Sequence, residues 1–171
     1  MNNKHPIFCY GSNGTGQLKL RLRNPNIIGT KCELSGYQRI FCGYSRKWGG
    51  AVASIIKTNN EQGTCKGSFV MLCDEEIRML DKFEGCDSDS PFSNDPNVNV
   101  YRREFVEIAV QEKTVRAIAY IKNNPKWTCA PTKKYLNACF THLKEFWEDL
   151  ESLPVYDQKN QLVSVFKPNE K

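Results

Sequence analysis

The middle of the chain is a series of segments rich in strand-forming residues, separated by turns and not by long helices. These segments cover residues 27–43, 51–57 and 65–73, with turns at Gly49-Gly50 and Asn59-Asn60. Runs of β-branched and aromatic residues that end at glycine or asparagine are typical of strands. Dinucleotide-binding folds repeat a strand-helix-strand unit, whereas here strands follow strands. The order of elements therefore disfavours such a fold.

A second strand-rich region predicts a hairpin. Apolar residues alternate with others over residues 106–110, and after a turn near Glu112-Lys113 the strand pattern continues over residues 115–121. Segments of period two that are joined by a short turn pair in this way. A short buried strand is also expected at residues 7–10, and residues 162–166 could add one edge strand. The sheet is then mainly antiparallel or mixed.

Helical patterns flank these strands. A helical turn that carries Leu18 and Leu22 is expected after a cap by Ser12 or Asn13. The longest helix is expected to begin at Thr132, which is a suitable capping residue. Its apolar stripe at helical period consists of Leu136, Cys139, Phe140, Leu143, Phe146, Trp147 and Leu150. We interpret this stripe as core, so the fold class is α+β.

The length of 171 residues suits one domain with its own core, spanning residues 1–171. The composition is 40% hydrophobic and 25% charged, as in ordinary globular proteins. Within the domain we expect residues 1–6 to be frayed, residues 86–100 to form a loop insertion and residues 155–171 to form a polar tail. The domain is expected to be a monomer or a homodimer.

Charge and cysteine content exclude several classes of function. The net charge of +5 is spread along the chain except at Lys19, Arg21 and Arg23, which alternate with leucines and are interpreted as a solvated face. We therefore expect no nucleic-acid partner. No apolar run approaches the roughly 18 residues of a membrane span. The eight cysteines include no C-x-x-C pair and follow no secretory leader, which favours reduced thiols in the cytoplasm.

The sequence also offers few residues that could form a phosphate-binding loop, a metal site or a catalytic triad. The glycine-rich stretch after the first strand resembles a phosphate loop, but Gln17 and Leu18 occupy the positions that should hold lysine and serine or threonine. The two histidines are His5, near the start of the chain, and His142, which we place at the surface or the edge of the core. No metal site and no cofactor are expected.

One carboxylate stands out among the remaining polar residues. A short helix is expected to begin at Asp74, with Ile77 and Leu80 at helical spacing, and to present Glu84-Gly85 at its far end. A glycine lets the chain turn sharply after such a helix and can place the carboxylate for acid/base work. The alternative interpretation is that Glu84 is an ordinary surface acid.

An ordered set of short motifs resembles the gamma-glutamylcyclotransferase family. The signature of that family near its N-terminus matches Tyr10-Gly11-Ser12-Asn13. Further matches follow in order at Leu22-Arg23-Asn24-Pro25, Gly49-Gly50-Ala51, Lys66-Gly67, Leu80-Asp81, Glu84-Gly85, Tyr101, Tyr120 and Tyr135. The resemblance covers residues 7–135. It favours the acid/base interpretation of Glu84.

The resemblance implies a small β-barrel-like sheet with flanking helices and an enzyme that releases 5-oxoproline from a small gamma-glutamyl substrate. It implies that Glu84 is the catalytic acid/base and that the Tyr10-Gly11-Ser12-Asn13 turn holds the glutamyl group. The strand beneath the turn would contribute Ile7, Phe8 and Cys9, and Tyr120 would contact the ligand. The implied activity belongs to glutathione metabolism and is of the lyase or acyltransferase type.

The proposed reaction needs no cofactor. The α-amine of the substrate must lose a proton to attack its own γ-carbonyl, and the departing amine must gain one, so one carboxylate can move the proton both ways. Ring closure also gains from intramolecular proximity.

Two departures from the family pattern border the expected pocket, namely Gly14-Thr15-Gly16 and the long 86–100 loop. The alternatives left open are action on glutathione or on gamma-glutamylamines, and a binding module that has lost turnover.

Overall fold

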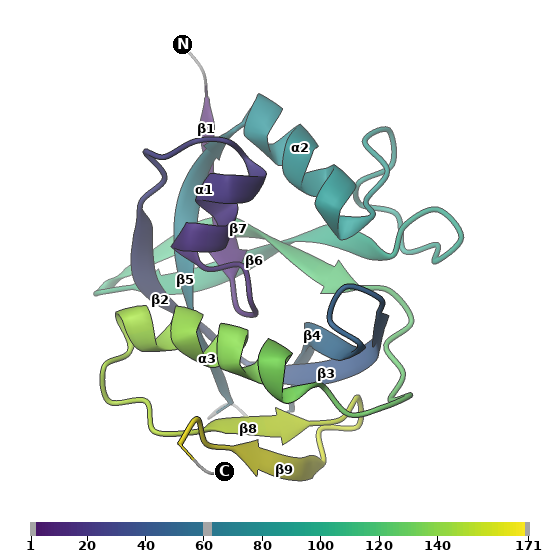
Figure 1. Cartoon of the computed structure of the whole chain (residues 1–171). Coiled ribbons are helices and arrows are strands. Elements are labelled where there is room, and N and C mark those ends of the chain that lie inside the picture. Colours follow the sequence, from purple (N-terminus) through teal and green to yellow (C-terminus); the bar gives the residue numbers. More distant parts are fainter. Residues whose placement is uncertain (1–2, 60–62, 170–171) are drawn as a thin grey trace.

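The computed structural model describes residues 3–59 and 63–169, and its centre is a closed five-stranded barrel (Figure 1). The strands follow the order β1 (Lys4–Cys9), β5 (Thr64–Cys73), β2 (Gly29–Ser35), β6 (Tyr101–Val110) and β7 (Lys113–Lys122). Three helices flank it, namely α1 (Thr15–Arg21), α2 (Asp74–Glu84) and α3 (Lys133–Phe146). The expected α+β fold with a barrel-like sheet is confirmed.

The barrel is mixed because one of its seams is parallel. All neighbouring strands pair antiparallel except β1 and β7, which pair parallel with Ile7 opposite Ile118. The predicted hairpin is β6–β7, whose ladder runs from Tyr101 opposite Lys122 to Val110 opposite Lys113. This ladder brings the start of β6 and the end of β7 to the same edge of the barrel.

Four further strands form two separate hairpins. β3 (Tyr37–Ser45) pairs with β4 (Gly50–Lys57), and β8 (Leu153–Tyr156) pairs with β9 (Leu162–Phe166). The strand-rich stretch expected over residues 27–43 is thus divided between two sheets, because Gly36 turns the chain with a φ of 76°. The strand expected at residues 162–166 exists, but it pairs with β8 and not with the barrel.

Several expected boundaries are wrong for local reasons. The cap of α1 is the backbone of Gly14, and neither Ser12 nor Asn13 caps it with a side chain. Thr132 caps α3 as predicted, since its hydroxyl accepts a hydrogen bond from the Tyr135 amide. That helix ends at Phe146, so the last two residues of the predicted stripe, Trp147 and Leu150, lie beyond it.

The ends of the chain are more ordered than expected. Residues 4–6 are not frayed, because Lys4 pairs with Cys73 at the start of the β1–β5 ladder. Residues 155–166 of the expected polar tail belong to the β8–β9 hairpin, which packs beside α3 through Phe140 and Phe166. Residues 1–2, residue 60 of the expected Asn59-Asn60 turn, and residues 170–171 lie outside the described part of the chain.

The loop at residues 86–100 contains no helix or strand, as predicted, yet it is fastened internally. The side chain of Asn99 is fully buried, and its amide donates to the carbonyl of Ser90 at 2.5 Å. The loop also closes on itself at its base, where the Val100 amide donates to the Gly85 carbonyl at 2.9 Å. This bond holds the entry of β6 beside the end of α2.

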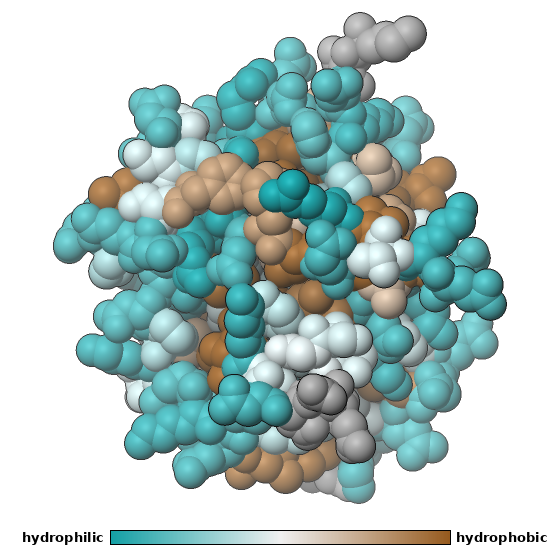
Figure 2. Space-filling view, turned by 180° about the vertical axis from the view of Figure 1, so that it is seen from behind, coloured by the Kyte–Doolittle hydropathy of each residue, from teal (hydrophilic) through white to brown (hydrophobic). Residues whose placement is uncertain are grey.

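Both faces of β1 are buried, which fixes the position of the turn that follows it. Ile7 and Cys9 belong to a cluster with residues of α1 and α2, whereas Phe8 and Tyr10 belong to a second cluster with α3 and the β3–β4 hairpin. A strand that is anchored on both faces cannot shift its register without exposing apolar groups. Hydrophilic side chains predominate on the face of the molecule that Figure 2 shows.

Candidate active site

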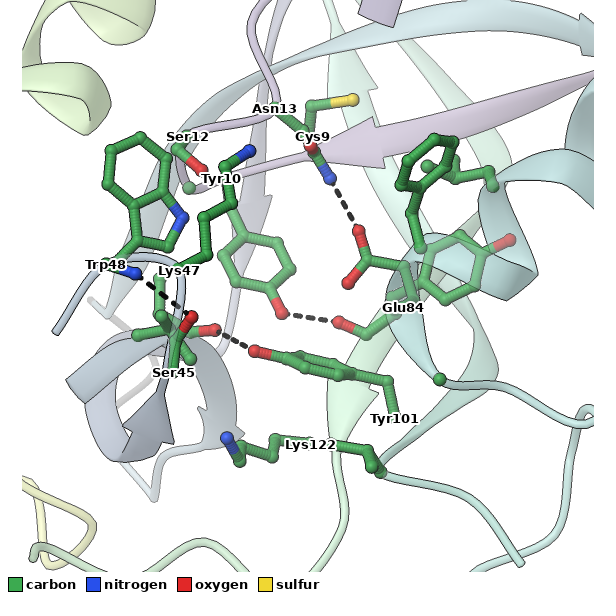
Figure 3. A pocket seen from close by; sticks show the side chains of 18 of the residues that line it. Cys9, Tyr10, Ser12, Asn13, Ser45, Lys47, Trp48, Glu84, Tyr101 and Lys122 are labelled. Carbon is green, nitrogen blue, oxygen red and sulfur yellow. Dashed lines mark hydrogen bonds between the residues drawn. The ribbon is translucent and has the colours of Figure 1, made fainter. Parts of the chain in front are cut away.

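A cavity of about 380 Å³ opens beside the turn that follows β1. The turn Tyr10-Gly11-Ser12-Asn13 forms one side, and the end of α2 with Glu84 forms another (Figure 3). The β3–β4 connection, the paired ends of β6 and β7, Arg21 of α1 and Tyr135 of α3 also line it. Residues from seven parts of the sequence therefore meet at one cavity.

Glu84 is the last residue of α2, and its carboxylate faces this cavity (Figure 3). Gly85 follows in the left-handed conformation, with a φ of 64°, and its amide donates to the carbonyl of Asp81. A residue with a side chain would be strained in this conformation, so α2 ends at this position because the residue is glycine. The Glu84 side chain is only 12% exposed.

Two side chains approach the same carboxylate oxygen. The amide nitrogen of Asn13 donates to Oε1 of Glu84 at 2.8 Å, and a guanidinium nitrogen of Arg21 lies 3.8 Å from that oxygen. Arg21 also donates to the side-chain oxygen of Asn13 at 2.8 Å. The three side chains hold Oε1, whereas Oε2 has no hydrogen bond or ion pair with another side chain of the described residues.

The surroundings of Glu84 raise its pKa above the usual value for a glutamate. Burial is the largest cause, and the negative charge of Asp81 adds to it. The hydrogen bond from Asn13 and the positive charge of Arg21 oppose this rise, with a smaller contribution from Lys122. A raised pKa makes this carboxylate a stronger proton acceptor than an exposed one, which is the property that a general base needs.

Arg21 corrects the prediction of a solvated basic face. Its side chain is only 16% exposed and lies against Asn13 and Glu84, whereas Arg23 is exposed. The guanidinium also lies over the ring of Phe83 at 5.1 Å. Alternation with leucines in the sequence did not reveal this role, because α1 is a helix and its residues do not alternate between two faces.

His142 on α3 supports the turn from behind. Its Nδ1 donates to the carbonyl of Gly11 at 2.6 Å, since a carbonyl can only accept, and its Nε2 lies 2.7 Å from the hydroxyl of Ser68. The side chain is 4% exposed, which excludes the surface and leaves the edge of the core from the two expected positions. Burial lowers the pKa of His142 to about 4, so the ring is neutral near pH 7. A Cβ at Gly14 would lie 3.1 Å from that of His142.

Four of the tyrosines that line the cavity have hydroxyl groups that are hydrogen-bonded to protein atoms. Tyr10 donates to the carbonyl of Tyr120, and Tyr101 donates to the carbonyl of Ala53 at 3.1 Å. The hydroxyl of Tyr135 accepts from the amide of Ala53 at 2.9 Å. These bonds fix the walls, so the aromatic rings present a rigid surface to any ligand.

The hydroxyl of Tyr120 forms a hydrogen bond within the protein that bears on its predicted contact with a ligand. Its hydroxyl donates to Oδ1 of Asp81 at 2.6 Å, and Asp81 is fully buried and also bound by Arg103. The ring of Tyr120 borders the cavity while its hydroxyl points to this buried pair. Contact between Tyr120 and a ligand therefore stays a prediction, and it would be made through the ring.

Every site residue proposed from the sequence borders the same cavity. This set comprises Ile7, Phe8, Cys9, Tyr10, Gly11, Ser12, Asn13, Glu84 and Tyr120. Burial raises the pKa of the Cys9 thiol to about 12, which leaves it protonated and unsuited to nucleophilic attack. Sequence reasoning missed Arg21, Lys47, Trp48 and Lys122, which also line the cavity.

Two negative findings concern the described residues 3–59 and 63–169. No group of three or more histidine, cysteine, aspartate or glutamate side chains among them is arranged to hold a metal ion. Within the same ranges, no helix has the length and apolar character needed to cross a membrane.

The motif that forms the turn recurs in a known family. Residues 7–138 match the profile described as gamma-glutamyl cyclotransferase, AIG2-like. The chain belongs to this family. The match begins within β1 and ends within α3, so it includes the turn, Glu84 and all of the barrel except residues 4–6 of β1.

Solved structures agree with membership of the gamma-glutamyl cyclotransferase, AIG2-like family at the level of the fold. A protein described as gamma-glutamyl cyclotransferase is 23% identical, with a TM-score of 0.71 over 87% of this chain and 83% of its own. An uncharacterized human protein is 24% identical with the same TM-score and coverage. A yeast gamma-glutamyl cyclotransferase specific to glutathione is 12% identical, with a TM-score of 0.58 over 85% and 89% of the two chains. No match was found among curated proteins.

Proposed function

We propose that this protein is a gamma-glutamylcyclotransferase that releases 5-oxoproline and a free amino acid or amine from gamma-glutamyl compounds. The observation that carries the proposal is the placement of one partly buried carboxylate, Glu84, against the turn that bears the family motif. Family membership supports the reaction type.

The reaction needs one proton to move between two nitrogen atoms. The α-amine of the substrate, after losing its extra proton to solvent, attacks the γ-carbonyl carbon and forms the ring C–N bond. Glu84 accepts the proton that the attacking nitrogen must shed and delivers it to the departing nitrogen as the amide C–N bond breaks. Atoms balance without water, metal or an enzyme-bound intermediate, since the nucleophile is part of the substrate.

The turn supplies candidate donors for the negative groups of the substrate. Within the described part of the chain, the backbone amides of Ser12 and Asn13 donate to no protein acceptor. Successive free amides in a turn bind carboxylates or developing oxyanions. His142 holds the Gly11 carbonyl, and the Ser12 amide of the same planar trans peptide points the opposite way, away from His142. We assign the turn to the glutamyl group for this reason.

The first experiment is a direct assay for 5-oxoproline. The purified protein is incubated with gamma-glutamyl dipeptides, glutathione and gamma-glutamyl-lysine, and the product is measured by liquid chromatography. We expect release from at least one compound and none from an α-linked glutamyl dipeptide, which cannot close the ring in this way. Absence of 5-oxoproline in every reaction would reject the proposed activity and favour a binding module.

A further inference from the structure

The lining of the cavity carries more positive than negative charge. Four basic side chains border it, namely Arg21, Lys47, Lys82 and Lys122, and the one acidic side chain among the described lining residues is Glu84. Arg21 is engaged by Asn13 and Glu84, and Lys82 is exposed at the rim. Lys47 and Lys122 are therefore the cations that remain for a ligand.

Lys122, at the end of β7, is held in place by contacts of its backbone and its side chain. Its backbone amide donates to the hydroxyl of Ser54 at 3.0 Å, and its ammonium lies 5.4 Å from the centre of the Tyr101 ring. Gly43 leaves the space for it, because a Cβ there would lie 2.5 Å from the ammonium nitrogen. No carboxylate of the described residues lies within 4.0 Å of this ammonium.

Lys47 enters the cavity from the β3–β4 connection (Figure 3). It also forms no ion pair with a described residue, and its nearest aromatic partner is Trp48, at 5.1 Å from the ring centre. Its pKa is lowered by partial burial and then by the positive charges of Arg21 and Lys134. An anion bound beside Lys47 would offset this repulsion.

From this arrangement we propose that Lys47 and Lys122 form a subsite for a carboxylate on the leaving part of the substrate. The inference rests on the proposed cyclotransferase function and narrows its substrate class. Substrates are gamma-glutamyl compounds whose departing amine carries a carboxylate, as amino acids and peptides do. Gamma-glutamylamines without such a group are poor substrates.

Charge balance supports this choice. The reactive glutamyl group brings one negative charge, its α-carboxylate, because its amine must be neutral to attack. Four basic side chains against one acidic one leave an excess of three positive charges around the cavity, and a second carboxylate on the leaving part would reduce what the first leaves uncompensated. An ammonium that lacks a protein partner and faces a partly enclosed space binds a carboxylate through a charge-assisted hydrogen bond.

The test compares matched substrates in matched variants. Gamma-glutamyl-glycine, glutathione and gamma-glutamyl-methylamide share the scissile bond, but only the methylamide lacks a carboxylate on the leaving part. The kcat/KM of each is measured by 5-oxoproline release for the wild type, Lys47→Gln, Lys122→Gln and the control Lys113→Gln. Lys113 is an exposed lysine at the other end of β7.

We expect Lys122→Gln to lower the kcat/KM of gamma-glutamyl-glycine or glutathione relative to the methylamide by at least about tenfold, mainly through KM. Lys47→Gln should act in the same direction, and Lys113→Gln should leave the ratio unchanged. Which of the two peptides is affected more identifies how far the bound carboxylate lies from the scissile nitrogen. Ratios equal to those of the wild type in both lysine variants would overturn the subsite.

A binding measurement separates this inference from the proposed function. Calorimetry with Glu84→Gln protein, which should bind without turnover, compares gamma-glutamyl-glycine with the methylamide in the presence and absence of Lys122→Gln. A preference for the dipeptide that disappears in the double variant supports the subsite even if no 5-oxoproline is ever released. Equal affinity for both ligands in the Glu84→Gln protein would reject it.

Discussion

The protonation of a single carboxylate is the central quantity at the scale of residues. Burial raises the pKa of Glu84, and Asn13 and Arg21 limit the rise. The form that accepts a proton from the substrate is the carboxylate, which is populated above this pKa. Activity should therefore increase with pH through a value above that of an ordinary glutamate, which is about 4.3.

Replacement of Glu84 by glutamine tests its assignment. Glu84→Gln keeps the size and the ability to accept from Asn13 but cannot accept a proton. We expect kcat to fall by at least about 100-fold, which is the lower end of general acid/base contributions, while ligand binding and the melting temperature are preserved. Folded Glu84→Gln protein with a kcat near that of the wild type would reject the assignment.

Arg21 should set the pH dependence without taking part in proton transfer. Arg21→Gln removes the positive charge that lies 3.8 Å from Oε1, so the pKa of Glu84 should rise further. The rising limb of the pH-rate profile should then move to higher pH. Arg23→Gln, on the exposed side, is the matched control. A profile that moves equally in both variants would show that the effect of Arg21 is not local.

Gly11 is constrained by packing and not by backbone strain. Its φ is not in the left-handed region, but a Cβ would lie 3.2 Å from the Cβ of Ala53 and 3.3 Å from the hydroxyl of Tyr135. Gly11→Val should therefore abolish ligand binding and destabilise the fold by about 1–3 kcal/mol. Gly16→Ala is the control, since nothing lies within 4 Å of its added Cβ. Normal binding by Gly11→Val would place the ligand elsewhere.

At the scale of elements, the sequence predicted a helix or a strand correctly where the residues of that element follow a single periodic pattern. The α2 helix and its glycine end, which place Glu84, follow from helical spacing and the freedom of Gly85. The β6–β7 hairpin follows from alternation. The cap of α1 did not follow, because the side chain of Asn13 is drawn to Glu84, a residue 71 positions away.

The assignment of strands to sheets also required information that a local pattern lacks. Residues 29–35 and 37–45 fall within one stretch of strand-forming residues, yet one strand joins the barrel and the other joins β4. Likewise, the basic character of Arg21 and Lys122 is visible in the sequence, but their meeting at one cavity depends on barrel closure. The family motif identified the turn and Glu84, and it carried no signal for His142.

At the scale of the whole molecule, His142 couples the stability of the fold to pH. The pKa of this side chain is about 4 in the folded protein and about 6.5 when unfolded, so the unfolded chain binds the extra proton first. The neutral ring contributes up to about 3 kcal/mol to the free energy of unfolding. This contribution is complete above pH 6.5 and is lost as the pH falls toward 4. Urea unfolding at a series of pH values should show this decline.

Two variants of His142 separate its proton from its hydrogen bond. His142→Asn keeps a donor for the Gly11 carbonyl, so it should retain much of the activity while losing the dependence of stability on pH between 4 and 6.5. His142→Phe removes the donor and should impair ligand binding more strongly. If the wild type and His142→Asn lose stability in parallel over this range, another group is responsible.

The parallel seam between β1 and β7 has a consequence for how the chain acquires activity. Ile7 and Ile118 are neighbours in the barrel but are separated by more than a hundred residues, and ordering of such distant contacts is slow. During synthesis, the strand that precedes the turn must wait for its last partner. Catalytic competence should therefore be gained late and all at once, and recovery of turnover after dilution from denaturant should report the final closing step of folding.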